Sequence, residues 1–184
     1  SDGGFMNAKS NLRTGGQVLV DQLRIHGVDT IFCVPGESYL ATLDALYDVS
    51  DEIRLIVCRQ EGGAAYMADA YAKLTGKPGV CLVSRGPGAA NASVGIHTAH
   101  QDSTPVVLLV GQVAREMAAR EALQEVDFRH MYGPLTKWVG QIEDPARVPE
   151  MVSRAFHTAA SGRPGPVLLA LPEDMQTEPA EAVD

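Results

Sequence analysis

Residues 80–88 read VCLVSRGPG, an aliphatic run followed directly by a glycine-rich turn. A run that is apolar at every position is typical of a strand buried on both faces, because a half-exposed strand alternates apolar and polar residues. The segment from Pro87 to Gln101 is rich in small residues and predicts a helix. The stretch therefore indicates a strand-turn-helix unit of the kind that builds α/β proteins.

The same alternation continues through most of the chain. Apolar runs predict further strands at residues 30–34, 53–58, 105–110, 136–139 and 166–171, and helical periodicity predicts helices at residues 14–27, 39–49, 60–75 and 145–160. Residues 114–132 carry mixed charges and predict a long excursion with a helical turn or two. Helices between aliphatic strands imply right-handed crossovers and a parallel sheet. We therefore predict an α/β fold, a three-layer sandwich with about six parallel strands.

Composition narrows the class of protein. The 184 residues carry a formal net charge of -8, which argues against nucleic acid or an anionic membrane as the partner, because both require a basic surface. Cys33, Cys58 and Cys81 lie in or beside apolar runs and are expected to be free thiols in a reducing compartment, which favours a cytoplasmic location. His97 and His100 have no third ligand at matching spacing, so we predict no metal site.

Both ends of the chain are expected to lie outside the folded domain. Residues 1–11 are interpreted as a tag remnant, SDGGF before Met6, with an N-terminal extension. The folded domain is assigned to residues 12–173. Residues 174–184 are acidic and contain no base, so we expect a linker or a disordered tail there.

Four loops are expected to meet at one edge of the sheet. They are the segments that follow predicted strands: Pro35-Gly36-Glu37, Arg59-Gln60-Glu61, Ser84 to Gly88, and Gly111-Gln112. In open α/β sheets ligands bind at the carboxyl ends of the strands. These loops are therefore the predicted location of the functional site.

Glu61 is the leading candidate for a working residue. It follows a strand, opens a helix and precedes the small residues of the stretch Gly62-Gly63-Ala64-Ala65. One interpretation is an acid that complements the helix dipole. The other is a partly desolvated carboxylate beside a surface that a flat ligand or another backbone approaches closely.

A second candidate is the glycine segment from Gly86 to Asn91, with the sequence GPGAAN. As a loop entering a helix it offers free N–H groups for an anion. It is neither a dinucleotide fingerprint nor a Walker loop, because the third glycine of the first and the Gly-Lys-Ser/Thr of the second are missing. The alternative is a tight turn that lets the helix pack closely.

Taken together, these motifs resemble a known family. The segments VPGE (34–37), RQEGGAAYMADAYA (59–72), GPGAAN (86–91), DSTP (102–105) and GQV (111–113) occur in the order and spacing of the N-terminal pyrimidine-binding (PYR) domain of thiamine-diphosphate enzymes. The acetolactate synthase-like group is the most similar. The resemblance covers nearly all of residues 12–173 and implies the thiamine-diphosphate-binding fold of six parallel strands.

The resemblance implies roles for single residues. The glutamate that matches Glu61 would be catalytic, sharing a proton with N1′ of the cofactor's aminopyrimidine ring and so promoting loss of the thiazolium C2 proton. The residues lining the pyrimidine end would be Pro35, Gly36, Glu37, Glu61, Gly86, Pro87, Gly88 and Asn91. A substrate channel would include Gln124, Gln112 and Lys137. Leu123 stands where the family has Phe, a departure from the acetolactate synthase pattern.

The resemblance also implies partners. The chain would bind thiamine diphosphate at its pyrimidine end only, with Mg²⁺ held by a C-terminal domain that carries a Gly-Asp-Gly…Asn motif absent here; FAD stays an open possibility. A homodimer or homotetramer would form through the small-residue helices at residues 60–75 and 87–101. The substrate would be a 2-oxo acid, with a middle and a C-terminal domain missing from this chain.

Several functions stay open at this point. The leading hypothesis is part of a carboligase that decarboxylates 2-oxo acids and joins the product to an acceptor, as in branched-chain amino acid biosynthesis. A simple 2-oxo acid or oxalyl-CoA-type decarboxylase, whether as a fragment or as a natural short subunit, is the nearest alternative. A non-catalytic nucleotide- or flavin-binding module and a purely structural interaction domain are the others.

Overall fold

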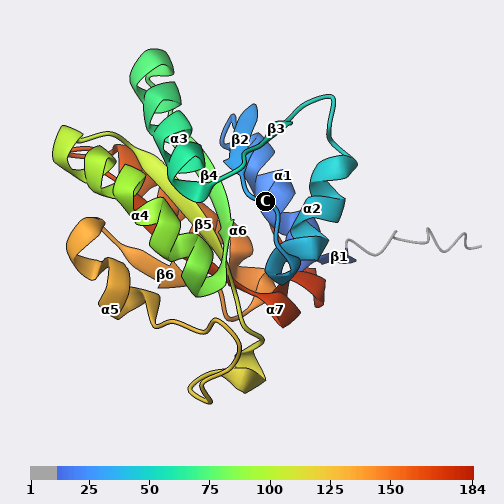
Figure 1. The fold of residues 1–184 in the computed structure, drawn as a ribbon. Coiled ribbons are helices and arrows are strands. Elements are labelled where there is room, and N and C mark those ends of the chain that lie inside the picture. Colours follow the sequence, from blue (N-terminus) through green and yellow to red (C-terminus); the bar gives the residue numbers. More distant parts are fainter. Residues whose placement is uncertain (1–11) are drawn as a thin grey trace, which may run out of the picture.

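The computed structural model describes residues 12–184, so the predicted tag remnant and extension at residues 1–11 lie outside the described residues. Its centre is a six-stranded parallel sheet with the order β3-β2-β4-β5-β7-β6 (Figure 1). The strands are β2 (Thr30–Cys33), β3 (Arg54–Val57), β4 (Gly79–Ser84), β5 (Val106–Gln112), β6 (Val139–Gln141) and β7 (Val167–Pro172). The prediction of about six parallel strands is confirmed.

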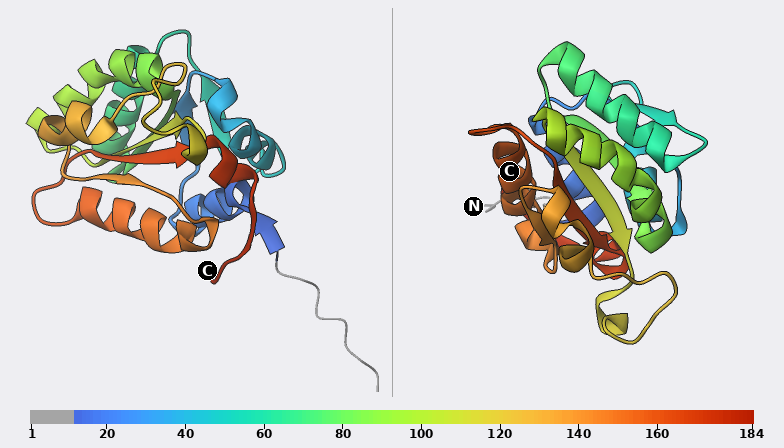
Figure 2. Two further views of the ribbon diagram at one scale, coloured as in Figure 1. Left: turned by 90° about the horizontal axis from the view of Figure 1, so that it is seen from below. Right: turned by 60° about the vertical axis from the view of Figure 1, so that its left-hand side comes forward.

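Helices cover both faces of this sheet. They are α1 (Gly15–Ile25), α2 (Leu40–Tyr47), α3 (Glu61–Thr75), α4 (Arg85–Asp102), α5 (Phe128–Tyr132), α6 (Val148–Ala160) and α7 (Glu173–Thr177), with 3₁₀ turns at Glu37–Tyr39, Arg115–Met117, Gly133–Leu135 and Pro145–Arg147. One apolar cluster joins α1, α2 and α6 to the sheet, and a second joins α3, α4 and α5 to it. The predicted three-layer sandwich is therefore confirmed, and Figure 2 shows the sheet between its helical layers.

Local sequence accounts for most element boundaries. Thr14 caps α1 by accepting a hydrogen bond from the Gln17 backbone N–H (3.2 Å), while the Gln17 side chain accepts from the Thr14 N–H (2.9 Å). Gly76 ends α3 in the left-handed region with φ of 73°, where glycine is least strained. Val80 to Val83 are fully buried, as the aliphatic run predicts for a central strand.

The strand predicted at residues 136–139 is displaced. Pairing with β7 runs from Val139 to Gln141, opposite Leu168 to Ala170. Thr136 instead donates its hydroxyl to the Tyr132 carbonyl (2.9 Å), which keeps it in the preceding turn. The prediction is therefore wrong at its amino end, because a side-chain bond to the preceding turn competes with strand pairing.

The acidic C-terminal segment is ordered, so the expectation of a disordered tail is wrong. After α7, β8 (Pro179–Glu181) pairs antiparallel with β1 (Leu12–Thr14) in a separate two-stranded sheet. Met175 is fully buried, and Arg13 bonds both Asp21 (2.6 Å) and Asp184 (3.0 Å). The negative charge that suggested disorder is balanced by arginines from distant parts of the chain.

Candidate functional site

Glu61 stands at the carboxyl edge of the sheet as the first residue of α3. Gln60 caps this helix, accepting a hydrogen bond from the Gly63 N–H (3.0 Å). The Glu61 side chain is half-buried, and its Oε2 accepts a hydrogen bond from Asn91 Nδ2 on α4 (2.9 Å). Within residues 12–184 no other hydrogen bond is made by the carboxylate, so Oε1 is available to an external donor.

Glycines bring α3 and α4 close enough for that contact. A Cβ on Gly95 would lie 2.5 Å from the Ala65 Cβ and 2.9 Å from the Ala65 carbonyl carbon. A Cβ on Gly62 would lie 3.1 Å from Val94 Cγ1. Only residues without side chains allow this approach, which places Asn91 beside Glu61. The space beside Gly63, by contrast, holds no atom within 4 Å of where its Cβ would stand.

The loop after β2 is pressed against the end of β4. A Cβ on Gly36 would lie 2.4 Å from Ser84 Cβ, so glycine is required here. The hydroxyls of Ser38 and Ser84 share a hydrogen bond of 2.8 Å. Pro35 and Glu37, the other predicted cofactor residues of this loop, are exposed at the same edge.

The predicted glycine loop is in fact helical. α4 starts at Arg85, directly after β4, and Gly86, Pro87 and Gly88 form its first turn. The reversal from strand to helix takes place at Arg85 itself, whose φ of 47° lies in the left-handed region. A single residue, Arg85, therefore makes the turn for which a glycine loop was expected. Its left-handed backbone conformation is strained, because it carries a Cβ.

Arg85 is also a site residue that sequence reasoning missed. Its side chain is 9% exposed, and it donates to Glu37 (3.2 Å) and to Glu173 (2.8 Å). The Nε atom is buried and has no hydrogen-bond partner among the described residues. The available signal was a single arginine inside the small-residue stretch at a strand end.

Residues 113–127, here called the strap, fold back over the ends of β4 and β5. Gly86 donates its N–H to the Gln124 carbonyl (2.9 Å), and Gln112 Nε2 donates to the Val126 carbonyl (3.0 Å). The Val113 N–H donates to Gln112 Oε1 (2.9 Å), so both ends of this buried amide are occupied. Gln112 therefore anchors the strap, whereas the Gln124 side chain is exposed above the Gly86 turn.

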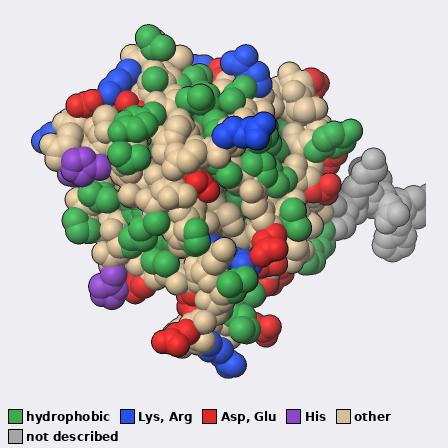
Figure 3. Space-filling model, viewed as in Figure 1, with side chains coloured by type: hydrophobic (Ala, Val, Ile, Leu, Met, Phe, Trp, Pro, Cys, Tyr) green, Lys and Arg blue, Asp and Glu red, His purple; other side chains and the backbone are tan. Residues whose placement is uncertain are grey.

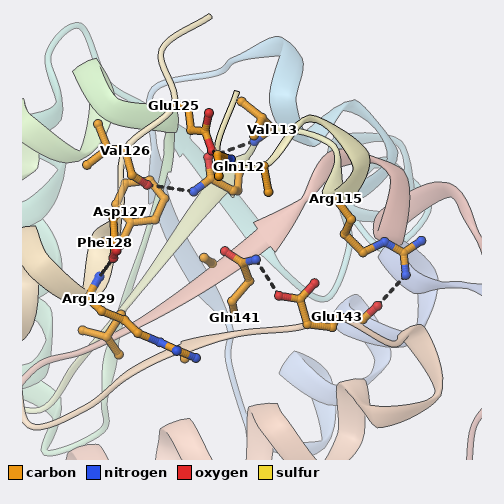
Figure 4. Close-up of a pocket in the computed structure, with 15 residues that line it drawn as sticks. Gln112, Val113, Arg115, Glu125, Val126, Asp127, Phe128, Arg129, Gln141 and Glu143 are labelled. Atoms are coloured by element: carbon orange, nitrogen blue, oxygen red, sulfur yellow. Dashed lines mark hydrogen bonds between the residues drawn. The ribbon is translucent and has the colours of Figure 1, made fainter. Parts of the chain in front are cut away.

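A pocket of about 330 Å³ lies beneath the strap, at the carboxyl ends of β5, β6 and β7 (Figure 4). Its polar lining comes from Gln112, Arg115, Glu125, Asp127, Arg129, Gln141 and Glu143. Gln141 Nε2 donates to Glu143 Oε1 across its floor (2.7 Å). Glu61 does not line this pocket, so the carboxyl edge holds two separate features.

Lys137 is not brought together with Gln112 and Gln124. It precedes β6 and therefore lies at the amino edge of the parallel sheet, opposite Glu61. Its ammonium donates to the carbonyls of Thr158 and Ser161 (2.7 Å to Ser161), beside the C-terminus of α6. Within this domain the predicted channel grouping is wrong for Lys137, because capping a helix terminus holds its charge elsewhere.

Neighbouring acidic groups around Glu61 remain neutral. Burial raises the pKa of the Cys33 thiol to about 11, and nearby Cys58 adds to the effect. Burial also raises the pKa of Cys81 and of Tyr39, and the Glu61 carboxylate contributes to both shifts. These groups hold their protons at neutral pH, so Cys81 and Tyr39 add no charge near the Glu61 carboxylate.

Residues 12–184 contain neither a cluster of metal ligands nor a membrane-spanning helix. No three His, Cys, Asp or Glu side chains gather there as a group that could hold a metal ion. No helix in that range is long and apolar enough to cross a membrane.

Comparison with known proteins gives this arrangement a family. Residues 13–131 match the family described as thiamine pyrophosphate enzyme, N-terminal TPP binding domain. The chain is 45% identical to the acetolactate synthase of Arthrospira platensis over 164 residues, 88% of this chain and 28% of the relative. It is 45% identical to the acetolactate synthase large subunit of Parasynechococcus marenigrum over 167 residues, 90% of this chain and 27% of the relative.

A eukaryotic relative shows the same coverage. The mitochondrial acetolactate synthase catalytic subunit of Aspergillus candidus is 41% identical over 163 residues, 89% of this chain and 23% of the relative. The chain thus spans about a quarter of the length of the curated relatives it matches. By this match, and by its six-stranded parallel fold, the chain belongs to the thiamine pyrophosphate enzyme family as an N-terminal, pyrimidine-binding domain of the acetolactate synthase-like kind.

Proposed function

We propose that this domain serves a larger thiamine-diphosphate-dependent enzyme that decarboxylates a 2-oxo acid and joins the product to an acceptor. The observation that carries the proposal is the state of Glu61. One carboxylate oxygen is bonded by Asn91 at 2.9 Å, and the other, at the carboxyl edge of the sheet, has no hydrogen-bond partner within residues 12–184. A carboxylate held in this way is suited to share a proton with a ring nitrogen.

The residues present fit the pyrimidine end of the cofactor. Oε1 of Glu61 accepts no hydrogen bond within residues 12–184, which leaves an acceptor for a ring nitrogen. Gly36 keeps the neighbouring loop free of a side chain at the end of β4. When bound, thiamine diphosphate supplies the electron sink that decarboxylation of a 2-oxo acid requires. We propose Pro35, Gly36, Glu37, Gly86, Pro87, Gly88 and Asn91 as the residues that line the ring with Glu61.

The chain's own contribution is to hold and orient a proton. Asn91 holds Oε2 of the Glu61 carboxylate by a hydrogen bond, and Oε1 is left to accept from a ligand. The close contact of α3 with α4 keeps Asn91 beside the carboxylate, which is half-buried. A hydrogen bond in such a half-buried place is stronger than one in bulk water.

The proposal for the complete enzyme includes its other cofactors, its assembly and its location. Mg²⁺ and the diphosphate would be held by a further domain, and FAD would meet the pocket beneath the strap, where Gln112 lies. A homodimer or homotetramer would form through α3 and α4, whose exposed residues include Tyr66, Met67 and Val94. Figure 3 shows hydrophobic side chains gathered on that face. We propose a cytoplasmic enzyme of branched-chain amino acid biosynthesis.

The family match removes the alternative of a nucleotide- or flavin-binding module without catalysis. A simple decarboxylase remains the second candidate, favoured by Leu123. This residue replaces the family's Phe in the strap and is 70% exposed. Product analysis with pyruvate distinguishes the two: a carboligase releases a five-carbon hydroxy acid, and a decarboxylase releases an aldehyde.

The test of the proposed role is a Glu61→Gln substitution in the complete enzyme. We expect exchange of the C2 proton of bound thiamine diphosphate to slow by roughly 10²- to 10⁴-fold, because the amide cannot share a proton with the ring. Deuterium exchange followed by NMR after acid quench measures this rate. Glu150→Gln, at an exposed position of α6, is the matched control. Unchanged exchange in Glu61→Gln contradicts the assignment.

A further inference from the structure

The loop that precedes α2 is held by a buried amide from α7. Gln176 is 1% exposed, and its Nε2 donates to the carbonyl of Ser38 (2.9 Å) and to that of Leu171 (3.0 Å). Its Oε1 accepts a hydrogen bond from the Thr42 hydroxyl (2.7 Å). Both polar atoms of the Gln176 side chain are therefore hydrogen-bonded. One of these bonds is to Ser38, the residue that follows Glu37.

A buried guanidinium forms a second link between the same two segments. Arg85 donates to Glu37 on the loop side (3.2 Å) and to Glu173, the first residue of α7, on the other (2.8 Å). The two carboxylates are exposed to solvent, but the guanidinium that joins them is not. Arginine is suited to this task, because its planar fork presents donors in two directions at once.

On the side of the sheet, the loop packs closely against the ends of β4 and β5. Ser38 shares a hydrogen bond with Ser84 (2.8 Å), and a Cβ on Gly111 would lie 1.9 Å from the Ser38 hydroxyl. A Cβ on Gly36 would collide with Ser84. Residues 36–38 are thus fixed from the sheet side by β4 and β5 and from the outer side by α7.

We propose that Gln176 and Arg85 are positioning residues of the cofactor site. Through Ser38 and Glu37 they hold residues 36–38 where these face the aminopyrimidine ring. This inference rests on the proposed function, and it assigns the C-terminal segment a task in cofactor affinity. Loss of either link lets the loop move and weakens cofactor binding, while the chemistry of Glu61 is left intact.

The first test uses amide hydrogen exchange in the 184-residue chain. The reporter is the Tyr39 N–H, which donates to the Gly36 carbonyl (3.5 Å) inside the loop. In Gln176→Met, which keeps the side-chain volume, we expect Tyr39 to exchange about tenfold faster relative to global unfolding, the loss of roughly one net hydrogen bond. Denaturant unfolding of each variant supplies the global reference.

Gln112→Met is the matched control. Gln112 is also a buried amide whose oxygen and nitrogen are both hydrogen-bonded, but it holds the strap and not the loop before α2. We expect it to accelerate exchange at Gly86, whose N–H donates to the Gln124 carbonyl, and to leave Tyr39 unchanged. Equal acceleration at both reporters in both variants shows a general loss of stability and overturns the inference. If Gln176→Met does not fold, Glu173→Gln, at a half-exposed side chain, is measured in its place, and unchanged Tyr39 exchange there overturns it too.

The second test uses the complete enzyme and separates affinity from turnover. In Gln176→Met and in Glu173→Gln we expect the thiamine diphosphate concentration for half-maximal activity to rise about tenfold, with kcat at saturating cofactor within about twofold of the wild type. Unchanged half-saturation overturns the positioning role. A wild-type enzyme that needs no thiamine diphosphate refutes the proposed function instead, and the exchange experiment still decides whether the two links hold the loop.

Discussion

Arg85 turns the chain from strand to helix within a single residue. Its φ of 47° is strained for a residue with a Cβ, at about 1–3 kcal/mol, and glycine would relieve that strain. Glycine would also remove the guanidinium that joins Glu37 to Glu173. The strain at Arg85 is therefore accompanied by two ion pairs that glycine could not make.

Glu125 is a second single residue with a structural role: its carboxylate stabilises the strap. It accepts hydrogen bonds from the backbone N–H groups of Ala119 (2.6 Å) and Ala122 (3.1 Å), while Ala119 and Gln124 have positive φ values of 61° and 63°. These backbone donors lower the pKa of Glu125. The pKa of Glu125 is lower in the folded state than in the unfolded state, where it is about 4.3. The ionised carboxylate therefore contributes to stability above about pH 4.3, and this contribution is lost as the pH falls through the pKa of the folded state.

This gives a pH prediction. In the wild type, the amide proton shifts of Ala119 and Ala122 are expected to titrate with a midpoint below about pH 4.3, the value for an unperturbed glutamate. In Glu125→Gln they are expected to show no such step, since the amide does not ionise. NMR titration from about pH 3 to about pH 7 measures both. A wild-type midpoint above 4.3 contradicts the arrangement.

At the scale of elements, the contact of α3 with α4 determines the site. The two helices meet through alanines and glycines, among them Ala65 and Gly95. Such small residues were expected to suit a dimer interface. In the structure their buried faces are used within the chain, and the outer faces with Tyr66 and Met67 are the ones left exposed.

Two glycine substitutions test this packing. In Gly95→Ala the new Cβ meets Ala65 backbone at 2.9 Å, so the helices must separate, and we expect a loss of about 1–3 kcal/mol in the free energy of unfolding. In Gly63→Ala no atom lies within 4 Å, so we expect a gain of about 0.5–1 kcal/mol from helix propensity. Urea unfolding of both variants measures the difference, and equal effects would contradict the close approach at Gly95.

At the scale of the whole molecule, α7 and β8 close the domain. Gly15 of α1 lies against the Met175 backbone, where a Cβ would come within 2.3 Å of the carbonyl oxygen. Arg115 bonds Asp174 through Nε (2.8 Å) and its backbone N–H (2.9 Å). The segment thus connects the first helix, the strap and the loop before α2.

Deleting the chain after Pro172 is expected to destabilise the domain severely. It removes buried Met175 and Gln176, and burial of one such apolar side chain alone contributes about 2–5 kcal/mol. We expect the shortened chain to unfold at a markedly lower temperature or to fail to fold, as thermal unfolding followed by circular dichroism will show. An unchanged melting temperature would contradict a stabilising role for α7 and β8.

The isolated chain is expected to bind thiamine diphosphate with a Kd weaker than about 1 mM, a binding free energy smaller than about 4 kcal/mol. The family resemblance implies that the anchors for diphosphate and Mg²⁺ lie on another domain, and the pyrimidine ring offers few contacts by itself. Titration calorimetry with and without Mg²⁺ measures this. Tight, Mg²⁺-dependent binding would contradict the division of the site between domains.

The amino-acid sequence by itself determined the α/β class, the parallel sheet and the candidate Glu61. The predicted strands at residues 30–34, 53–58 and 166–171 lie within one residue of β2, β3 and β7 at each end. The reason is local: an aliphatic run bounded by glycine and proline predicts a buried strand without information from other segments. The carboxyl-edge location of the loops then follows from parallel topology alone.

Only the tertiary structure decided which polar groups meet. Gln176 bonds Ser38 across 138 residues, and Arg85 bonds Glu173 across 88. Lys137 was separated from Gln112 and Gln124 by its bonds to carbonyls near the end of α6. A side chain's partner depends on how distant segments fold against each other, and neither periodicity nor composition carries that information. The ordered C-terminal segment was missed for this reason, since its charges are balanced by arginines far away in the sequence.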